Sequence, residues 1–314
     1  MKDEIGHEKW PHQPVLYHEI INALRPRGGG LYVDCTLGAG GIAQGLLEAS
    51  SPDGRLLGLD LDPEALELSR KRLAPFKARV TLVKASFVTL MDQLKVMGWD
   101  TVDGIVLDLG VSSMQLDSPT RGFSFRVDAP LDMRFDPHQT LTAASLVNEL
   151  PEAELADVLW RYGEERRSRQ VAKAIVQARP IKTTQQLSEV VVKVTRGGRK
   201  GIHPATRTFQ ALRIAVNREP ESLKEVLPQA VATLVPGGRL AVISFHSLED
   251  RLVKAFFRQE SRDCVCPPEQ VICTCKHRAV ISMITRHVIK PTAEEVKRNP
   301  RSRSARLRVV ERLP

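Results

Sequence analysis

The stretch Leu31-Tyr32-Val33-Asp34-Cys35-Thr36-Leu37-Gly38-Ala39-Gly40-Gly41 decides the fold of this chain. An apolar run ends in an acidic residue, a turn with three glycines follows, and helical spacing begins at Ile42. Glycine is required where the backbone turns tightly or lets a ligand approach without a Cβ in the way. The stretch therefore predicts the first strand and the ligand-binding loop of an α/β sheet.

The flanking sequence repeats this alternation of short apolar runs with amphipathic segments, which is typical of parallel strands joined by crossover helices. Asp62 as a cap before Pro63 marks one helix start. The predicted strands are Leu31–Cys35, Arg55–Asp60, Val80–Lys84 and Gly104–Leu109, and the predicted helices are Ile42–Ala49 and Pro63–Leu73. We expect a doubly wound sheet.

From about Gln115 to Asn217 the strand pattern stops and helical spacing takes over. The helices predicted there are Thr142–Leu150, Glu152–Tyr162, Arg167–Ala178 and Gln185–Val194, the last with a capping-box pattern from Thr183 to Gln186. The pattern then resumes with a helix at Ser222–Leu234 ended by Pro236-Gly237-Gly238, a strand at Arg239–Ser244, a helix at Leu248–Arg258 and strands at Ile281–Ile289 and Ala305–Val310. The sequence thus predicts a seven-stranded sheet with an antiparallel edge, in a domain of residues 1–114 and 218–314 interrupted by a helical domain of residues 115–217.

Composition narrows the class of protein. The 314 residues are 42% hydrophobic and 26% charged, which suffices for a sizeable core, and the formal charge of +9 favours a polyanionic partner. No apolar run of about 18 residues and no signal-peptide pattern is present, so we expect a cytoplasmic protein without membrane contact. In that reducing compartment the five cysteines are not expected to form disulfides.

Acidic residues end three of the predicted strands. Because ligands bind beyond the carboxyl ends of parallel strands, Asp34, Asp60 and Asp108 should converge on one site, where Asp60 can bind ribose hydroxyls. The pattern G-x-G-x-x-A at Gly38–Ala43 also suits a nicotinamide enzyme. A carboxylate such as Asp34 repels a pyrophosphate but tolerates a cationic sulfonium or amino group, so S-adenosylmethionine is favoured over a dinucleotide.

Several further motifs, in order along nearly the whole chain, resemble one family, the bacterial 16S ribosomal RNA (cytosine-N4)-methyltransferases. They are His12-Gln13-Pro14-Val15-Leu16 with Glu19, Asp34 to Gly41, Asp103 to Ser113 with Gln115-Leu116-Asp117, Arg121-Gly122-Phe123-Ser124-Phe125, Pro130-Leu131-Asp132-Met133-Arg134, Tyr162-Gly163-Glu164-Glu165-Arg166, His203 to Gln210, Ile243 to Arg251 and Asn299 to Ser304.

The resemblance implies a class I methyltransferase with a Rossmann-like sheet and an inserted helical domain. It also implies S-adenosylmethionine as cofactor and, as substrate, a decoding-centre cytosine of 16S ribosomal RNA within the small ribosomal subunit, with no DNA. Carried over by motif, the cofactor contacts are Gly40, Gly41, Ile42, Asp60, Phe87, Asp108 and Gln115. Some relatives carry His in place of Ile42, so only a backbone contact would survive there.

A cytosine amine is a weak nucleophile, so the site must position it and accept a hydrogen bond from its N–H. Asp108 is the leading candidate for this catalytic role, and His246, Ser112 and Ser113 are weaker ones. His246 could equally be a structural histidine. The alternative to an enzyme is a non-catalytic ribosome-assembly factor that binds RNA, which the retained acidic and glycine residues disfavour.

Two further clusters remain open. Basic residues gather at Arg196–Gly201 and in a tail that carries Arg298, Arg301, Arg303, Arg306 and Arg308; they could contact RNA, and in the tail the alternation from Arg306 to Val309 also fits an edge strand with outward arginines. Cys264, Cys266, Cys273 and Cys275 form a C-x-C-x6-C-x-C pattern. Its spacing differs from the common zinc pairs, so we expect no metal and keep a zinc site at these cysteines as the weaker alternative.

Overall fold

The computed structural model describes residues 14–195, 203–270 and 272–314. Contacts divide the chain into a first unit, residues up to Gly110 together with Ser222–Pro314, and a second unit, Val111–Glu221. The assignment of these parts as a methyltransferase domain and an inserted domain stays a prediction. His12, Gln13 and the basic segment Arg196–Gly201 lie outside the described residues.

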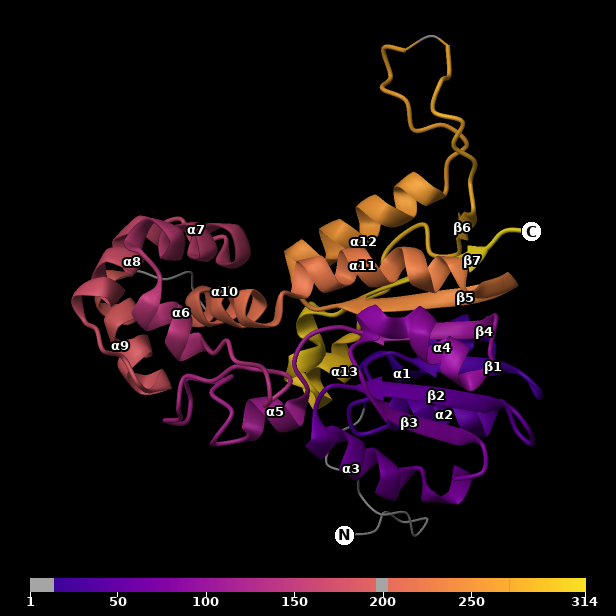
Figure 1. The fold of residues 1–314 in the computed structure, drawn as a ribbon, viewed down its shortest axis with the longest axis horizontal. Helices are drawn as coiled ribbons and strands as arrows, with labels where there is room; N and C mark the ends of the chain where they lie inside the picture. The colour runs from indigo at the N-terminus through magenta and orange to yellow at the C-terminus, as the bar shows by residue number, and fades with distance from the viewer. Residues whose placement is uncertain (1–13, 196–202, 271) are drawn as a thin grey trace. The chain divides into compact units, whose positions relative to one another are not determined.

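The first unit is built on a mixed sheet (Figure 1). In the described part of the chain its order is β3-β2-β1-β4-β5-β7-β6, parallel from β3 to β5, with β7 antiparallel to both β5 and β6. The strands are β1 (Leu31–Asp34), β2 (Arg55–Asp60), β3 (Val80–Lys84), β4 (Val102–Asp108), β5 (Leu234–Ser244), β6 (Ile281–Met283) and β7 (Arg306–Arg312). The predicted α/β fold class is confirmed.

Helices cover both faces of this sheet. One apolar core joins alternate strand residues such as Val33, Ile105 and Val242 to helices α4, α11 and α12; the other joins Tyr32, Val106 and Ile243 to α1, α2 and α3. The helices are α1 (Tyr17–Leu24), α2 (Gly41–Ala49), α3 (Pro63–Arg72), α4 (Leu90–Met97), α11 (Glu219–Ala232), α12 (Ser247–Glu260) and α13 (Ala293–Arg298), with short 3-10 turns at Ala74–Phe76, Phe87–Thr89 and Pro300–Ser304. None of the helices described here combines the length and apolar composition needed to cross a membrane.

Several predicted bounds are corrected. The first strand ends at Asp34, so Cys35 lies in the turn, and the helix predicted at Ser222–Leu234 is α11, which begins at Glu219 and ends at Ala232. The Pro236-Gly237-Gly238 segment lies inside β5, where the register against β4 shifts. The strand predicted over Ile281–Ile289 is only β6, followed by an isolated bridge from Ile289 to Leu307.

The C-terminal strand also differs from its prediction. β7 lies between β5 and β6 rather than at the edge, and Arg308 does not face outward: it is 7% exposed. Its Nε donates to Asp250 Oδ1 at 2.8 Å, while Arg306 Nη1 donates to Asp250 Oδ2 at 2.7 Å. Asp250 belongs to α12, so this carboxylate ties a helix to the strand beneath it.

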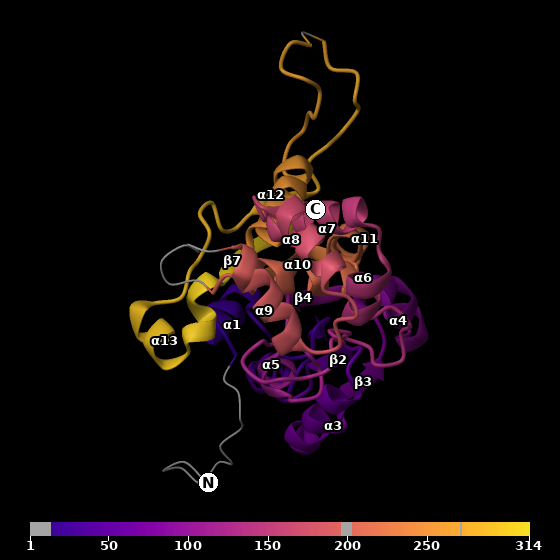
Figure 2. The ribbon, with the colours of Figure 1, turned by 90° about the vertical axis from the view of Figure 1, so that its left-hand side faces the viewer.

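A long loop, residues 261–280, connects α12 to β6. In both views it projects beyond the end of α12, away from the strands (Figure 1, Figure 2). Its two arms are paired at the base, where the backbone N–H of Val280 donates to the Glu260 carbonyl at 2.9 Å and the N–H of Ala279 donates to Asp263 Oδ1 at 3.2 Å. We refer to residues 264–275 as the loop tip.

The second unit is helical and has its own apolar core. Its helices are α5 (Ser113–Asp117), α6 (Ala143–Glu149), α7 (Glu152–Gly163), α8 (Ser168–Gln177), α9 (Thr184–Val194) and α10 (Thr206–Asn217). The prediction missed α10, although Phe209, Leu212 and Val216 bury one of its faces. The predicted capping box from Thr183 to Gln186 is confirmed at the start of α9.

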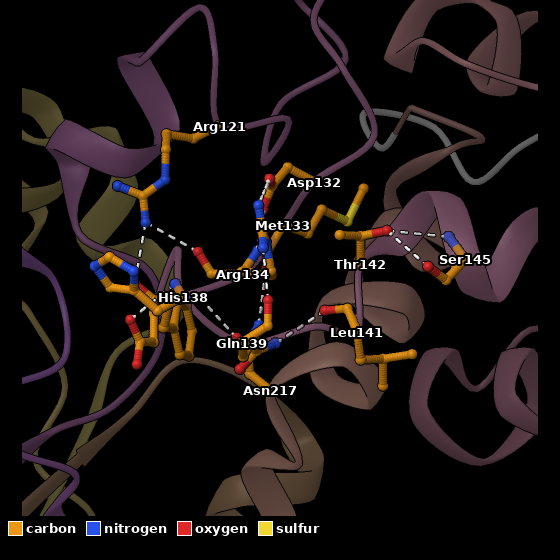
Figure 3. Close-up of polar contacts among 12 residues, drawn as sticks. Arg121, Asp132, Met133, Arg134, His138, Gln139, Leu141, Thr142, Ser145 and Asn217 are labelled. Carbon is orange, nitrogen blue, oxygen red and sulfur yellow. Dashed lines mark hydrogen bonds and ion pairs between the residues drawn. The ribbon is translucent and has the colours of Figure 1, made fainter.

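Polar contacts organise the segment between α5 and α6 (Figure 3). Arg134 binds both carboxylate oxygens of Asp132, at 2.8 and 2.6 Å, and its Nη1 donates to the Gln139 carbonyl. Asn217 at the end of α10 donates to the Met133 carbonyl and accepts the N–H of Phe135. A segment without regular secondary structure is thereby held in one conformation.

Candidate functional site

Three carboxyl groups lie at the carboxyl ends of neighbouring parallel strands. In the strand register Asp34 of β1 pairs with Gly58 of β2 and with Val106 of β4, so Asp60 and Asp108 end the neighbouring parallel strands two residues further on. The predicted convergence of these three residues is therefore what the structure shows. The order β2-β1-β4 places β1, with its glycine loop, in the middle.

The glycine loop takes a conformation that side chains oppose. Gly38 and Gly40 have φ angles of +52° and +74°, a region that L-residues other than glycine rarely adopt. A Cβ on Gly41 would collide with the Pro14 ring and lie 3.1 Å from Arg72 Nη1. Gly40 is the N-cap of α2 and supplies no side-chain cap. In the first turn of the helix the N–H of Ala43 donates to the Asp34 carboxyl group.

The strand-end residues fix this loop in place. The N–H of Gly38 donates to Asp60 Oδ2 at 2.8 Å, and the N–H of Thr36 donates to Asp34 Oδ1 at 3.1 Å. Thr36 Oγ1 accepts the backbone N–H of Asp108 at 2.6 Å. Sequence reasoning gave Thr36 no role, although its place directly after the strand that carries Asp34 was a usable signal.

Asp108 Oδ1 is buried without a hydrogen-bond partner in the described chain. Asp34 Oδ2 is buried and makes no hydrogen bond of standard geometry, although the N–H of Ala43 contacts the Asp34 carboxyl group. Among the described residues, no ion pair neutralises the carboxyl group of Asp34 or that of Asp108. Burial raises the pKa of Asp34 to about 7, of Asp60 to about 6 and of Asp108 to about 8, and the negative charge of Asp34 contributes to the rise at Asp108. A ligand that brings positive charge or N–H donors would relieve this penalty.

These pKa values predict how stability depends on pH. Aspartate ionises near pH 4 in an unfolded chain, so between about pH 4 and pH 8 the folded chain holds protons that the unfolded chain has released. The contribution of these groups to the free energy of unfolding of the ligand-free protein should therefore fall as pH rises through that window. Asp108→Asn cannot ionise, so the melting temperature of the variant minus that of the unchanged protein should rise from pH 5 to pH 8.5, by about 2–4 °C for each kcal/mol.

Differential scanning calorimetry from pH 5 to pH 9 measures this difference. Taking the variant minus the unchanged protein cancels the titrating groups that do not interact with Asp108. Two melting curves that stay parallel across the range would show that Asp108 does not retain its proton in the fold.

The other predicted cofactor residues are placed as follows. The Ile42 side chain is 5% exposed in the core beneath α2, which leaves its backbone as the part available to a ligand. Phe87 begins the turn after β3 and packs partly against the core. Gln115 belongs to the second unit, where it forms a capping box with Ser112 at the start of α5; Ser113 is the first residue of that helix. Their roles toward a cofactor stay predictions.

His246 has a structural role in the fold. It is the N-cap of α12: its Nδ1 accepts the N–H of Glu249 at 3.4 Å, and its Nε2 lies 3.1 Å from Glu249 Oε1. Glu249 in turn accepts the N–H of Phe245 at 2.8 Å. Glu249 is 4% exposed, and its charge contributes to the raised pKa of Asp108. Sequence reasoning missed Glu249, although His246 and Glu249 have the spacing of a capping box.

Two groups of residues singled out in the sequence remain, the cysteines and the arginines of the C-terminal tail. The four cysteines at the loop tip come together, and the fifth, Cys35, is buried after β1. In the C-terminal tail Arg298, Arg301 and Arg303 are exposed, whereas Arg306 and Arg308 are held by Asp250.

Comparison with known proteins identifies the family and relatives of this chain. The model of the MraW methylase family matches residues 9–313. A ribosomal RNA small subunit methyltransferase H of Dehalococcoides mccartyi is 52% identical over 97% of this chain and 87% of its own length, and one of Syntrophobacter fumaroxidans is 50% identical over 96% of each chain. Among solved structures, a putative rRNA methylase from Clostridium thermocellum aligns with a TM-score of 0.46 and 13% identity over 97% of this chain and 100% of that one.

Proposed function

Because the chain belongs to the MraW methylase family, we propose that it transfers a methyl group from S-adenosylmethionine to the exocyclic N4 amine of a cytosine in 16S ribosomal RNA. Relatives about half identical over nearly the full length are named for methylation of small-subunit ribosomal RNA. The motif resemblance supports a cytosine of the decoding centre within the small subunit. Ribosomal subunits are assembled in the bacterial cytoplasm, where we place the reaction.

The observation that carries the proposal is the pair of buried carboxyl groups, Asp34 and Asp108, that no cation neutralises in the described chain, beside a glycine loop. S-adenosylmethionine carries a sulfonium and an ammonium group, and such cations suit Asp34 and Asp108, which no cation neutralises in the described chain. Asp60 already orders Gly38 and keeps lone pairs for ribose hydroxyls. The open first turn of α2 at Gly40, Gly41 and Ile42 offers backbone contacts. When bound, the cofactor supplies an electrophilic methyl group.

The residues of the chain would then act on the amine. The N4 nitrogen would gain a bond to the methyl carbon while the bond from that carbon to the sulfonium sulfur breaks, leaving a neutral thioether, and the nitrogen must lose one proton. We assign Asp108, which the positive charge of the bound cofactor would hold ionised by lowering its raised pKa, as the acceptor of a hydrogen bond from that N–H. This interaction strengthens as positive charge develops on nitrogen. Glu249 and Asp34 place negative charge beside Asp108, which favours its taking up the proton. No cysteine nucleophile is needed for transfer to an amine, and the buried Cys35 stays a packing residue in this scheme.

For the RNA we propose contact through the exposed Arg298, Arg301 and Arg303. We propose the same for the basic segment Arg196–Gly201, which lies outside the described residues. Cations on these residues would release counterions from phosphates. We expect neither DNA nor a membrane as a partner.

The test is methyl transfer from labelled S-adenosylmethionine to purified small ribosomal subunits that lack the modification, with the labelled nucleoside identified by mass. We expect N4-methylcytidine at one position. Label in another nucleoside would refute the substrate. Cofactor binding without any labelled RNA would favour a non-catalytic assembly factor, and binding of a nicotinamide dinucleotide instead would refute the cofactor.

A further inference from the structure

Four cysteine sulfurs converge at the loop tip, away from the strand-end site. The Sγ atoms of Cys264, Cys266, Cys273 and Cys275 all lie within 4.8 Å of one another. Cys273 Sγ and Cys275 Sγ are 3.6 Å apart, and Cys275 Sγ and Cys264 Sγ are 3.9 Å apart. These separations are far longer than the S–S bond of a disulfide, about 2.05 Å.

Tetrahedral zinc predicts such separations. With Zn–S bonds of about 2.3 Å, the edges of a tetrahedron of sulfurs are about 3.8 Å long. Observed distances of 3.6 and 3.9 Å bracket that value.

Backbone groups of the tip also point at the sulfurs. The N–H of Val265 donates to Cys275 Sγ at 3.5 Å, so one arm of the loop contacts the thiol of the other. The N–H of Thr274, on the second arm, contacts the thiol of Cys266 on the first arm. Amide donors directed at sulfur stabilise thiolates, the form in which cysteine binds a metal.

No apolar core explains this convergence. Every described residue from Cys264 to Cys275 is exposed or half-exposed, and Ile272 is 76% exposed. The pairing at the base of the loop ends at Asp263 and Ala279, before the cysteines. A projecting segment with no buried side chain needs another source of stability, and small metal sites supply one.

We propose that Cys264, Cys266, Cys273 and Cys275 bind one zinc ion that folds the loop tip. Binding replaces water ligands of Zn²⁺ by four thiolate sulfurs and releases the thiol protons to solvent, with no change of oxidation state. The closed four-sulfur set leaves no position for a substrate, so the site is structural. His277 is not a ligand, because its Nδ1 lies 2.8 Å from the Arg262 carbonyl and its Nε2 faces Glu260.

Metal analysis of the full chain, purified without chelators and then equilibrated with zinc alone, tests the site. We expect about one zinc per chain. Cys264→Ser and Cys273→Ser should each lower zinc retention after dialysis at least about tenfold, because three sulfurs hold the ion far less tightly. Cys35→Ala is the matched control: it removes the one cysteine outside the cluster and should keep full zinc content.

Cobalt in place of zinc gives a second readout that does not depend on activity. We expect the absorption bands of tetrahedral cobalt-thiolate coordination in the unchanged protein and in Cys35→Ala, and their loss in Cys264→Ser. Trypsin should cut after Lys276 only once a chelator has removed the metal. Zinc content that is negligible after equilibration, or equal in the cysteine variants and the unchanged protein, would overturn the proposal, as would four thiols oxidised to disulfides in the protein as isolated.

Discussion

Replacing Asp108 by asparagine is expected to lower kcat for methyl transfer by about 10²–10³-fold while the chain stays folded. Asparagine keeps the shape of the side chain, and its amide oxygen can still accept a hydrogen bond, but it cannot take up the proton that the N4 amine must lose. It also removes the buried negative charge that would face the developing cation. The measurement is single-turnover transfer to small subunits at saturating cofactor, with cofactor affinity determined separately.

Asp103→Asn is the matched control for this experiment. Asp103 lies on the same strand, β4, but at its amino end, where it accepts the N–H of Leu31 at 2.8 Å and pairs with Arg27. Its substitution should leave kcat unchanged. If Asp108→Asn weakens cofactor binding and leaves kcat intact at saturation, Asp108 holds the cofactor and does not act on the amine.

Removing the Asp250 carboxylate should produce the largest loss of stability. Asp250→Ala leaves Arg308, which is 7% exposed, with a buried charge that has lost its partner. Removal of one partner of a buried ion pair costs about 3–5 kcal/mol. Chemical denaturation of the ligand-free protein should show this as a lower midpoint with little change in slope.

Two variants separate charge burial from general disruption. Glu67→Ala breaks an ion pair of the same 2.8 Å length, with Lys71, but on the exposed surface of α3, and should leave the midpoint unchanged. The double substitution Asp250→Leu with Arg308→Met replaces the buried pair by apolar side chains and should recover much of the loss. A double variant as unstable as Asp250→Ala would show that the cost comes from packing instead.

The first four strands could be predicted from local sequence because each is a short apolar run bounded by turn residues. Strand ends at Asp34, Asp60 and Asp108 then placed the candidate site, since parallel strands meet at one edge. The position of β7 between β5 and β6 could not be predicted in this way, because it depends on pairing between distant segments.

The burial of Arg308 could not be predicted for the same reason. Alternating arginines suggested an exposed edge strand, yet Arg308 is buried because Asp250, 58 residues earlier, lies against it. The spacing of the four cysteines did not match common zinc motifs, and only the pairing of the two loop arms brings their sulfurs together. His246 was weighed for chemistry, although the glutamate three residues later indicated a helix cap.

The strand order has a consequence for vectorial synthesis of the chain. β4 ends at Asp108, but its partner β5 begins only at Leu234, so the whole of Val111–Glu221 is translated while the β4 edge stays unpaired. The backbone edge of β4 that pairs with β5 in the finished sheet has no partner during that interval, and the other edge of β5 has none until β7 is translated. An open apolar edge of this kind invites aggregation. The tendency of the nascent chain to aggregate, and with it the need for chaperones, should therefore increase with the time taken to translate the segment between β4 and β5.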